Sequence, residues 1–187
     1  MWSLANPTRF LELADRLIPW LAGLTFLLLG IGLYLSFFVA PPDYQQGETV
    51  KIMFVHVPSA WLAMFGYTLI AIASIGSLIW RHPLADVAAK TAAPIGATFC
   101  FVALVGFVNV PIIKFSVDWW NTLHQPASIF RTGGPTIDPA LLTPLLVMAV
   151  GFTLLFVLLH LIAMRAEILR RRVHALRQVH VERAAAA

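Results

Sequence analysis

Apolar residues run along this chain in four long stretches that contain no charged side chain. They extend from Leu17 to Ala40, from Val57 to Trp80, from Thr91 to Ile113 and from Pro139 to Met164. A helix needs about 20 apolar residues to cross the hydrocarbon of a bilayer. Because each stretch reaches that length, the pattern predicts four transmembrane helices. We expect an all-α, polytopic membrane protein with one membrane domain over residues 1–187.

The segment before the first span has a different pattern. From Asn6 to Trp20, apolar and charged residues alternate at helical spacing after an Asn-Pro opening, which predicts an amphipathic helix in the membrane interface. The first span is too long for the core of a signal peptide. Phe38 also stands where a cleavage site after Ala40 would need a small residue, so we expect a retained anchor.

The segment after the fourth span is strongly basic. Residues 165–187 predict a helix that continues from the span, and they include three consecutive arginines, Arg170 to Arg172. Such a tail is typical of a topology anchor that lies against anionic headgroups. A docking site for a cytoplasmic partner is the alternative.

The distribution of basic residues predicts the orientation. Four spans place ten cations on one side: Arg9, Arg16, Arg81, Lys90, Arg165, Arg170, Arg171, Arg172, Arg177 and Arg183. The other side receives only Lys51, Lys114 and Arg131. Since positively charged loops stay in the cytoplasm, both termini are expected there, with residues 165–187 as a cytoplasmic tail.

Composition agrees with this class of protein. Hydrophobic residues make up 59% of the chain and charged residues 12%, which excludes an ordinary water-soluble domain. The pI near 9.7 reflects mainly the tail, so we expect no nucleic acid partner. Cys100 is the single cysteine. It therefore predicts a packing residue and excludes both an internal disulfide and a CxxCH site for covalent haem attachment.

Two histidines lie beside apolar spans, and the predicted orientation places both on the outer face. His56 stands in FVHVPSAW and His124 in VDWWNTLHQPAS. Haem iron can take one imidazole nitrogen from each side of the flat ring. The pair therefore predicts a non-covalent haem b site with His56 and His124 as axial ligands. A histidine at this depth can also be an ordinary interfacial hydrogen-bonding group, and that alternative stays open.

Aromatic side chains border the pair of histidines: Phe54, Trp61, Trp119 and Trp120. They could cover a porphyrin, but tryptophans at a membrane surface are usually belt residues. Pro58 suits the first turn of the second helix, where a missing N–H costs nothing. His56 is then expected just above that helix.

Other polar residues have competing interpretations. Arg131 and Lys51 are outer cations that could reach haem propionates, although pairing with Asp118 or Glu48 would explain them equally. His160 lies within the fourth span, where a hydrogen bond between helices is the simpler role. The remaining histidines stand among arginines on the cytoplasmic side: His82, His174 and His180.

The two histidine segments resemble a known family. IMFVHVPSAW and SVDWWNTLHQPASI are similar to the histidine-bearing outer loops of the CcmC family, the haem-handling proteins of cytochrome c maturation in the wider cytochrome c assembly family. The likeness runs from the PTRF opening through KTAAPIGATFCFVALV and GGPTIDPALLTPLL to the basic tail. It covers nearly the whole chain and implies that His56 and His124 are axial haem ligands.

The resemblance also implies a place and partners. It predicts that the chain binds haem b at the periplasmic face of the bacterial inner membrane. The haem then passes to a membrane-tethered haem chaperone for attachment to c-type apocytochromes. The resemblance also implies that an ABC transporter pair and a small single-span subunit assist. No residue is identified as catalytic, so we expect a carrier and not an enzyme.

The chain departs from the family pattern at one point. Between Val105 and Gly106, relatives normally carry a tryptophan-rich outer segment, a further span and the start of the next. The family's six spans become four here, and both histidines stay on one face because two crossings are lost. Either the protein is shortened or the sequence reproduces only part of a longer chain. We favour the second explanation, because a working protein is hard to reconcile with that loss.

Two other functions fit a membrane protein of this kind. A transporter subunit for a small solute would need polar residues at the midplane, and the spans supply few beyond Asn109, His160 and some Ser and Thr. A scaffold that only assembles partners would use the aromatic residues as a belt, with incidental histidines. Absorbance spectra of the purified protein and its histidine variants distinguish these functions from a haem carrier.

Overall fold

The computed structural model describes residues 6–43, 47–107 and 137–185. Within these ranges four long helices account for most residues: α1 (Pro7–Tyr34), α2 (Met53–Trp80), α3 (Pro83–Phe107) and α5 (Pro139–Ala185). Each is long and apolar enough to cross a membrane. The predicted all-α, four-span architecture is therefore confirmed for the described part of the chain.

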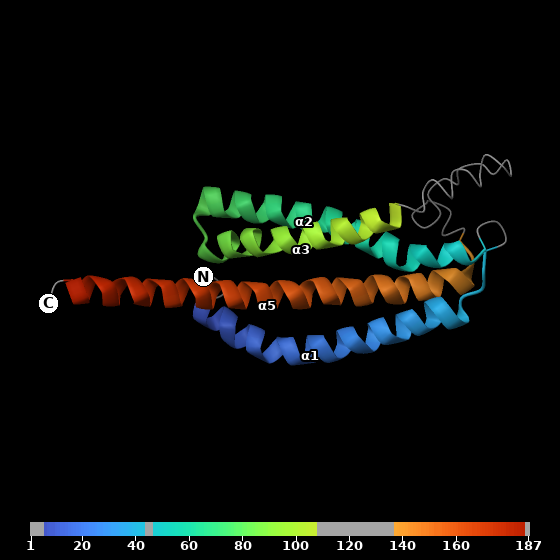
Figure 1. The fold of residues 1–187 in the computed structure, drawn as a ribbon, viewed down its shortest axis with the longest axis horizontal. Helices are drawn as coiled ribbons and strands as arrows, with labels where there is room; N and C mark the ends of the chain where they lie inside the picture. Colours follow the sequence, from blue (N-terminus) through green and yellow to red (C-terminus); the bar gives the residue numbers. More distant parts are fainter. Residues whose placement is uncertain (1–5, 44–46, 108–136, 186–187) are drawn as a thin grey trace.

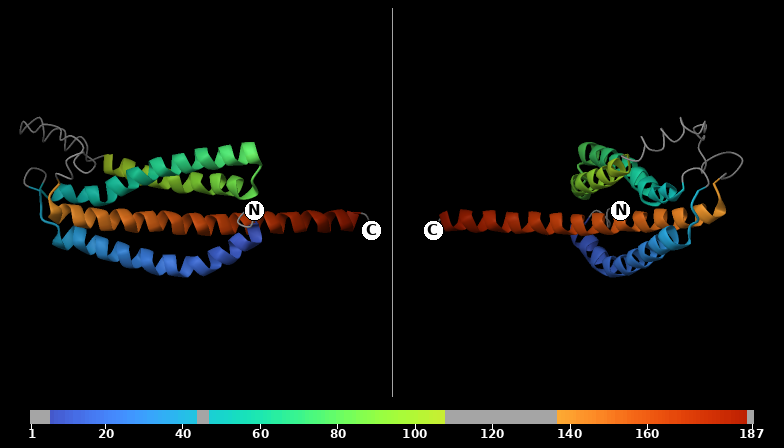
Figure 2. Two further views of the ribbon diagram at one scale, coloured as in Figure 1. Left: turned by 180° about the vertical axis from the view of Figure 1, so that it is seen from behind. Right: turned by 45° about the vertical axis from the view of Figure 1, so that its right-hand side comes forward.

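Helix α5 lies at the centre of the arrangement. The antiparallel pair α2 and α3 packs along one side of α5, and α1 packs along the other (Figure 1). Two further views keep the same order (Figure 2). The start of α1, the α2–α3 turn and the basic end of α5 all lie towards one end of the bundle. The beginning of α2, which carries His56, lies at the opposite end.

Helix α1 joins the predicted amphipathic opening and the first span into one element. Asn6 caps it, with its side-chain oxygen accepting from the Thr8 N–H at 2.9 Å, and Pro7 follows at the first position. The helix is bowed (Figure 1) and contains Pro19, which cannot donate a backbone hydrogen bond. A π-helical turn, Leu35–Val39, completes it before Pro41.

Helix α2 begins earlier than the sequence pattern predicts. A 3₁₀ segment, Glu48–Ile52, leads directly into Met53, so His56 and Pro58 both lie inside α2. The expectation that His56 stands above the helix, with Pro58 in its first turn, was wrong. The physical reason is Phe54, which is fully buried in a cluster with Val50, on the 3₁₀ segment, and Leu145, on α5. Burying Phe54 extends the helix towards the end of the bundle opposite the basic tail.

Two close contacts at glycine residues bring the helices together, one against a backbone and one against a side chain. A Cβ atom on Gly66 of α2 would lie 2.9 Å from the Cα of Gly96 on α3, so these two helices touch through glycine. A Cβ on Gly151 of α5 would lie 2.9 Å from Leu29 of α1. Small residues at crossing points are typical of helices packed in a membrane.

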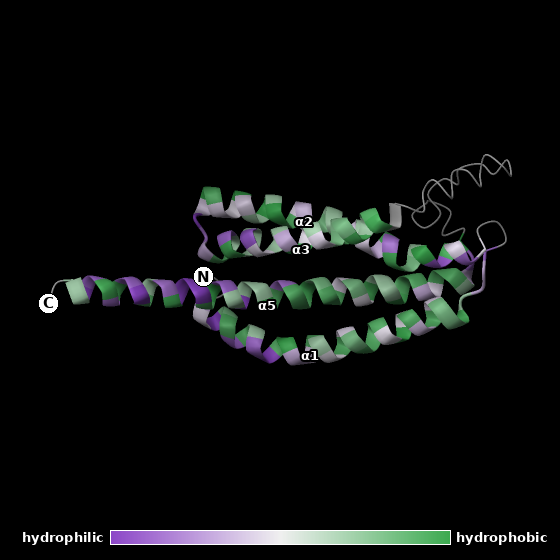
Figure 3. Ribbon diagram, in the orientation of Figure 1, coloured by the Kyte–Doolittle hydropathy of each residue, from purple (hydrophilic) through white to green (hydrophobic). Residues whose placement is uncertain are grey.

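The outer surface of the bundle is apolar. Large side chains such as Phe26, 75% exposed, and Leu78, 80% exposed, point away from the protein. Figure 3 shows hydrophobic colour along most of the bundle and hydrophilic colour on the end of α5. Surfaces of this extent suit contact with lipid and not with water. The chain is a multi-pass membrane protein.

An ion-pair network ties the basic end of α5 to its neighbours. The Glu167 carboxylate, only 9% exposed, accepts from Lys90 of α3 at 2.8 Å and from Arg170 and Arg171 at 2.7 and 2.8 Å. Arg171 also pairs with Asp86 of α3 at 2.7 Å. These contacts fix the direction in which the tail leaves the bundle. Beyond Ile168, every described residue of α5 is exposed.

Candidate functional site

His56 is held by the backbone of a neighbouring helix. Its Nδ1 lies 3.0 Å from the carbonyl oxygen of Ala103 on α3, and the contact is partly buried. A carbonyl oxygen can only accept, so Nδ1 carries the proton and donates. In the neutral ring this leaves Nε2 unprotonated, with its lone pair available to a metal. Fixing the second nitrogen in this way is what metal-binding histidines commonly require.

Phe54 sets how α2 is rotated about its own axis. This side chain has no exposed surface and packs against Leu145 and Met148 of α5. His56 follows two residues later, about 200° further around the helix, and so faces α3 when Phe54 faces α5. Phe54 thus positions the histidine from within the core. Phe54 therefore has a packing role in this structure, and its place beside a porphyrin stays a prediction.

Lys51 is engaged by the protein. Its ammonium group pairs with Glu48 at 2.7 Å and donates to the carbonyl of Phe37 at 3.0 Å. The second contact caps the carboxyl end of the first span, where a cation is favourable. Of the two roles that the sequence left open for Lys51, the structure shows the pairing with Glu48.

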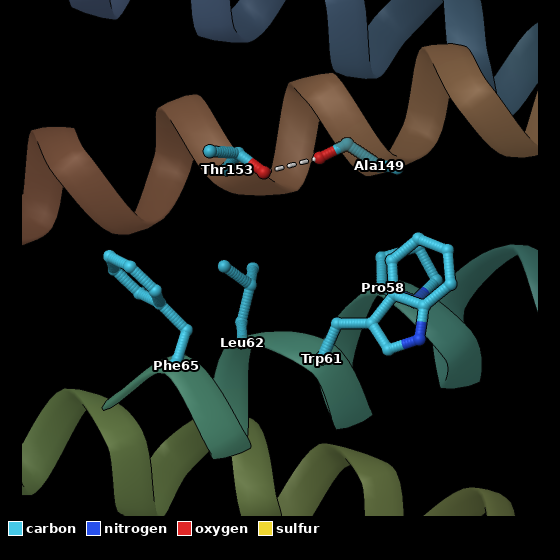
Figure 4. Close-up of a pocket in the computed structure, with 6 residues that line it drawn as sticks. All are labelled: Pro58, Trp61, Leu62, Phe65, Ala149 and Thr153. Carbon is cyan, nitrogen blue, oxygen red and sulfur yellow. Dashed lines mark hydrogen bonds between the residues drawn. The ribbon is translucent and has the colours of Figure 1, made fainter. Parts of the chain in front are cut away.

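Trp61 faces a different neighbour from His56. With Pro58, Leu62 and Phe65 it lines a groove of about 220 Å³ between α2 and α5, and Figure 4 shows these side chains pointing towards Ala149 and Thr153. The hydroxyl of Thr153 donates to the Ala149 carbonyl at 2.7 Å. The groove is smaller than the roughly 300–1,000 Å³ of typical ligand pockets. We therefore do not assign the haem to this groove.

Four predicted site residues lie outside the described residues: His124, Trp119, Trp120 and Arg131. Their roles as second axial ligand and as haem surroundings stay predictions. Within the described ranges, no group of three or more His, Cys, Asp or Glu side chains could hold a metal ion. A haem site built on two histidines does not need such a group.

The intramembrane histidine and the cysteine contact other helices. His160 lies with Nδ1 3.5 Å from the hydroxyl of Thr91 on α3, and its ring centroid lies 6.0 Å from that of Phe156. This agrees with the helix-packing role expected for it. Cys100 is a free, partly buried thiol packed against the core cluster of α2, α3 and α5.

Sequence patterns missed the backbone group that contacts His56 and the glycine contact between α2 and α3. Ala103 acts through its backbone carbonyl, so its side chain carries no signal. Gly66 and Gly96 could not be singled out, because the chain has 11 glycines. Some of these, such as Gly23 and Gly30, have open space around them and make no close contact. A small-residue position on each of two adjacent spans was the available clue.

Comparison with known proteins identifies the family. The family described as heme exporter protein C matches residues 1–105 and 101–179 of this chain. The chain belongs to the heme exporter protein C family. A relative of that name in Bradyrhizobium diazoefficiens is 52% identical, and the alignment covers 97% of this chain and 90% of the relative. Relatives in Escherichia coli K12 and Paracoccus denitrificans are 33% and 30% identical over 90% and 94% of this chain, and 92% and 96% of their own lengths.

The comparisons also locate the predicted junction. The two family matches meet at residues 101–105, next to the point where the sequence predicts a missing block. The alignment with the Bradyrhizobium protein runs over 238 residues, whereas this chain has 187. Part of the relative therefore has no counterpart in this chain.

Proposed function

We propose that this chain binds haem b non-covalently at the periplasmic face of the bacterial inner membrane and hands it to a haem chaperone during cytochrome c maturation. The observation that carries the proposal is the hydrogen bond from His56 Nδ1 to Ala103, which leaves Nε2 available as an axial ligand. The relatives are named heme exporter protein C. That name supports a haem-handling role.

The haem is cargo, and its iron supplies coordination positions above and below the ring. His56 fills one of these positions through Nε2, and Ala103 holds the imidazole in the required tautomer. His124 supplies the second position. Trp119, Trp120 and Arg131 complete the surroundings. Lys51 is occupied by Glu48 and Phe37, so Arg131 is the cation that we assign to a propionate.

The periplasmic assignment rests on charge. The end of the bundle that carries Lys90, Arg170 and Arg171 lies opposite the start of α2. Since positive segments stay in the cytoplasm, this end faces the cytoplasm with both termini. His56 then lies at the periplasmic surface, where apocytochromes receive haem.

The partners follow from the same role. A membrane-tethered chaperone receives the haem, and an ABC transporter pair with a small single-span subunit assists. The relatives are named as heme exporters, which supports a transporter system as partner. We assign the chain no catalytic residue and describe it as a carrier.

Absorbance spectra of the purified protein test this proposal. The expected result is a Soret band in the unaltered chain that is lost or strongly reduced in His56→Ala and His124→Ala. His180→Ala is the matched control, because this histidine is exposed in the tail and its hydrogen bond, to the Leu176 carbonyl, lies within its own helix. An apo protein from a haem-replete host would favour a scaffold. A Soret band retained in both ligand variants would overturn the site.

A further inference from the structure

The distance between α2 and α3 controls the hydrogen bond that orients His56. His56 belongs to α2, and its acceptor, Ala103, belongs to α3. A hydrogen bond of 3.0 Å weakens when its atoms separate by a few tenths of an ångström beyond the normal range. Whatever sets the spacing of this helix pair therefore sets the orientation of the imidazole.

Gly66 and Gly96 bring the backbones of these two helices into close contact. A Cβ atom added to Gly66 would lie 2.9 Å from the Cα of Gly96 and 3.7 Å from its backbone nitrogen. Real Cβ atoms essentially never come so close, and a backbone atom cannot rotate away. Any side chain at position 66 therefore forces α2 and α3 apart.

The two glycines are not equivalent. A Cβ added to Gly96 would lie 3.5 Å from the Cα of Gly66, an ordinary van der Waals distance. The same substitution, glycine to alanine, is thus expected to separate the helices at position 66 and to leave them in place at position 96. One interface provides both the test and its control.

The helix pair is also joined at its other end. Only Arg81 and His82 connect Trp80 of α2 to Pro83 of α3, and Arg81 takes a left-handed conformation with φ 50°. The turn holds the helices together at the end remote from His56. Separation at Gly66 therefore reaches the His56 end, where the chain has no such turn.

We infer that Gly66 is a positioning residue for His56: its contact with Gly96 holds α2 close enough to α3 for Ala103 to fix the imidazole with Nε2 free. The effect of Gly66 on haem binding rests on the proposed haem-binding role of His56. The hydrogen bond and the helix contact themselves belong to the protein without haem. They can be measured without it.

The first experiment uses the haem-free protein in detergent. Nitrogen-15 NMR of labelled histidine distinguishes the two neutral tautomers of each ring, and the His56 signal is assigned by its loss in His56→Gln. The unaltered chain and Gly96→Ala are expected to show His56 protonated at Nδ1. Gly66→Ala is expected to show both tautomers. A His56 ring protonated at Nε2 in the unaltered chain would overturn the inference, even if Gly66→Ala fails to fold.

The second experiment measures haem binding and reduction potential in the same three proteins. Loss of an orienting hydrogen bond typically costs 10–100-fold in metal affinity, so Gly66→Ala is expected to release haem at least about 10-fold more readily. Its potential is expected to rise, because a ring without the Nδ1 hydrogen bond donates less charge to iron. Equal effects of Gly66→Ala and Gly96→Ala, or none in either, would contradict the inference.

The two proposals fail in different ways. Haem binding that survives His56→Ala would refute the proposed ligand, whatever Gly66 does. A His56-dependent haem site whose tautomer and potential are unchanged in folded Gly66→Ala would refute the positioning role alone.

Discussion

The imidazole of His56 donates from Nδ1 to the backbone carbonyl of Ala103 at 3.0 Å. This single contact decides which ring nitrogen is available, and it comes from a residue whose side chain gives no hint of a role. Hydrophobic patterning could indicate where His56 lies, beside the second span. It could not indicate the acceptor, because every residue has a carbonyl group.

Phe54 is the residue that we expect to matter most for the packing around the start of α2. It is fully buried among Val50, Leu145 and Met148. Phe54→Ala should lower the free energy of unfolding by about 3 kcal/mol, the lower end for a buried phenylalanine. It should also weaken haem binding, because α2 loses its rotational anchor.

Denaturant or thermal unfolding in detergent checks this prediction. Phe38→Ala is the matched control, because Phe38 is 79% exposed near the same end of the bundle. Equal stability of the two variants would show that Phe54 does not anchor α2.

At the scale of elements, the sequence predicted the four spans because charge is absent from each of them. The predicted ends of the first two spans, before Pro41 and Arg81, agree with the structure. Helix α2 ends at Trp80, as predicted. The beginning of α2 was missed, because Met53 to His56 become helical through contacts that Phe54 makes with α5. Helix α3 starts at Pro83, ahead of the predicted apolar span. Its first turns carry charged residues that pair with α5.

The basic tail emerges as a straight continuation of α5 in all views (Figures 1 and 2). Glu167 lies beyond the predicted span, and its ion pairs hold the beginning of the tail against the bundle. Hydrogen bonds from Arg170, Lys90 and Arg171 hold the pKa of this carboxyl group far below its ordinary value of 4.5. The ion pairs behind this lowered pKa join the first turns of the tail to α3.

Glu167→Gln should weaken the contacts between the beginning of the tail and α3. A carboxyl group whose pKa is lowered by folding stabilises the folded state at pH values above its pKa in the unfolded chain. That stabilisation is lost progressively as the pH falls from there towards the pKa in the folded protein. We therefore expect the unaltered tail to become more sensitive to proteolytic cleavage as pH drops below about 4.5, measured with an acid-active protease. Glu167→Gln should be sensitive already at pH 7.

Glu182→Gln is the control for this experiment, since Glu182 lies on the exposed part of the tail and has no ion pair among the described contacts. Identical cleavage of the Glu167→Gln and Glu182→Gln variants at pH 7 would argue against the fastening role of Glu167.

At the scale of the whole molecule, the break near Val105 and Gly106 is the main departure from the family. The family model matches the chain on both sides of it, so the sequence was sufficient to locate it. What the block contributes cannot be derived from the residues that remain. If the encoded protein lacks it, we expect haem binding with impaired delivery to the chaperone.

Sequencing the encoding DNA across this junction, together with the intact mass of the purified protein, decides whether the block exists in the cell. Insertion of the corresponding segment from the Bradyrhizobium relative should then restore cytochrome c maturation without changing the Soret band. Full delivery by the shortened chain would contradict this expectation.

The electron paramagnetic resonance spectrum of the ferric, haem-loaded protein tests the shared iron most directly. If His56 and His124 clamp one haem, the unaltered chain gives a low-spin signal typical of two imidazole ligands, and His56→Ala converts it to a high-spin signal or loses the haem. A purified chain without haem, or a spectrum that His56→Ala leaves unchanged, would contradict the proposed function.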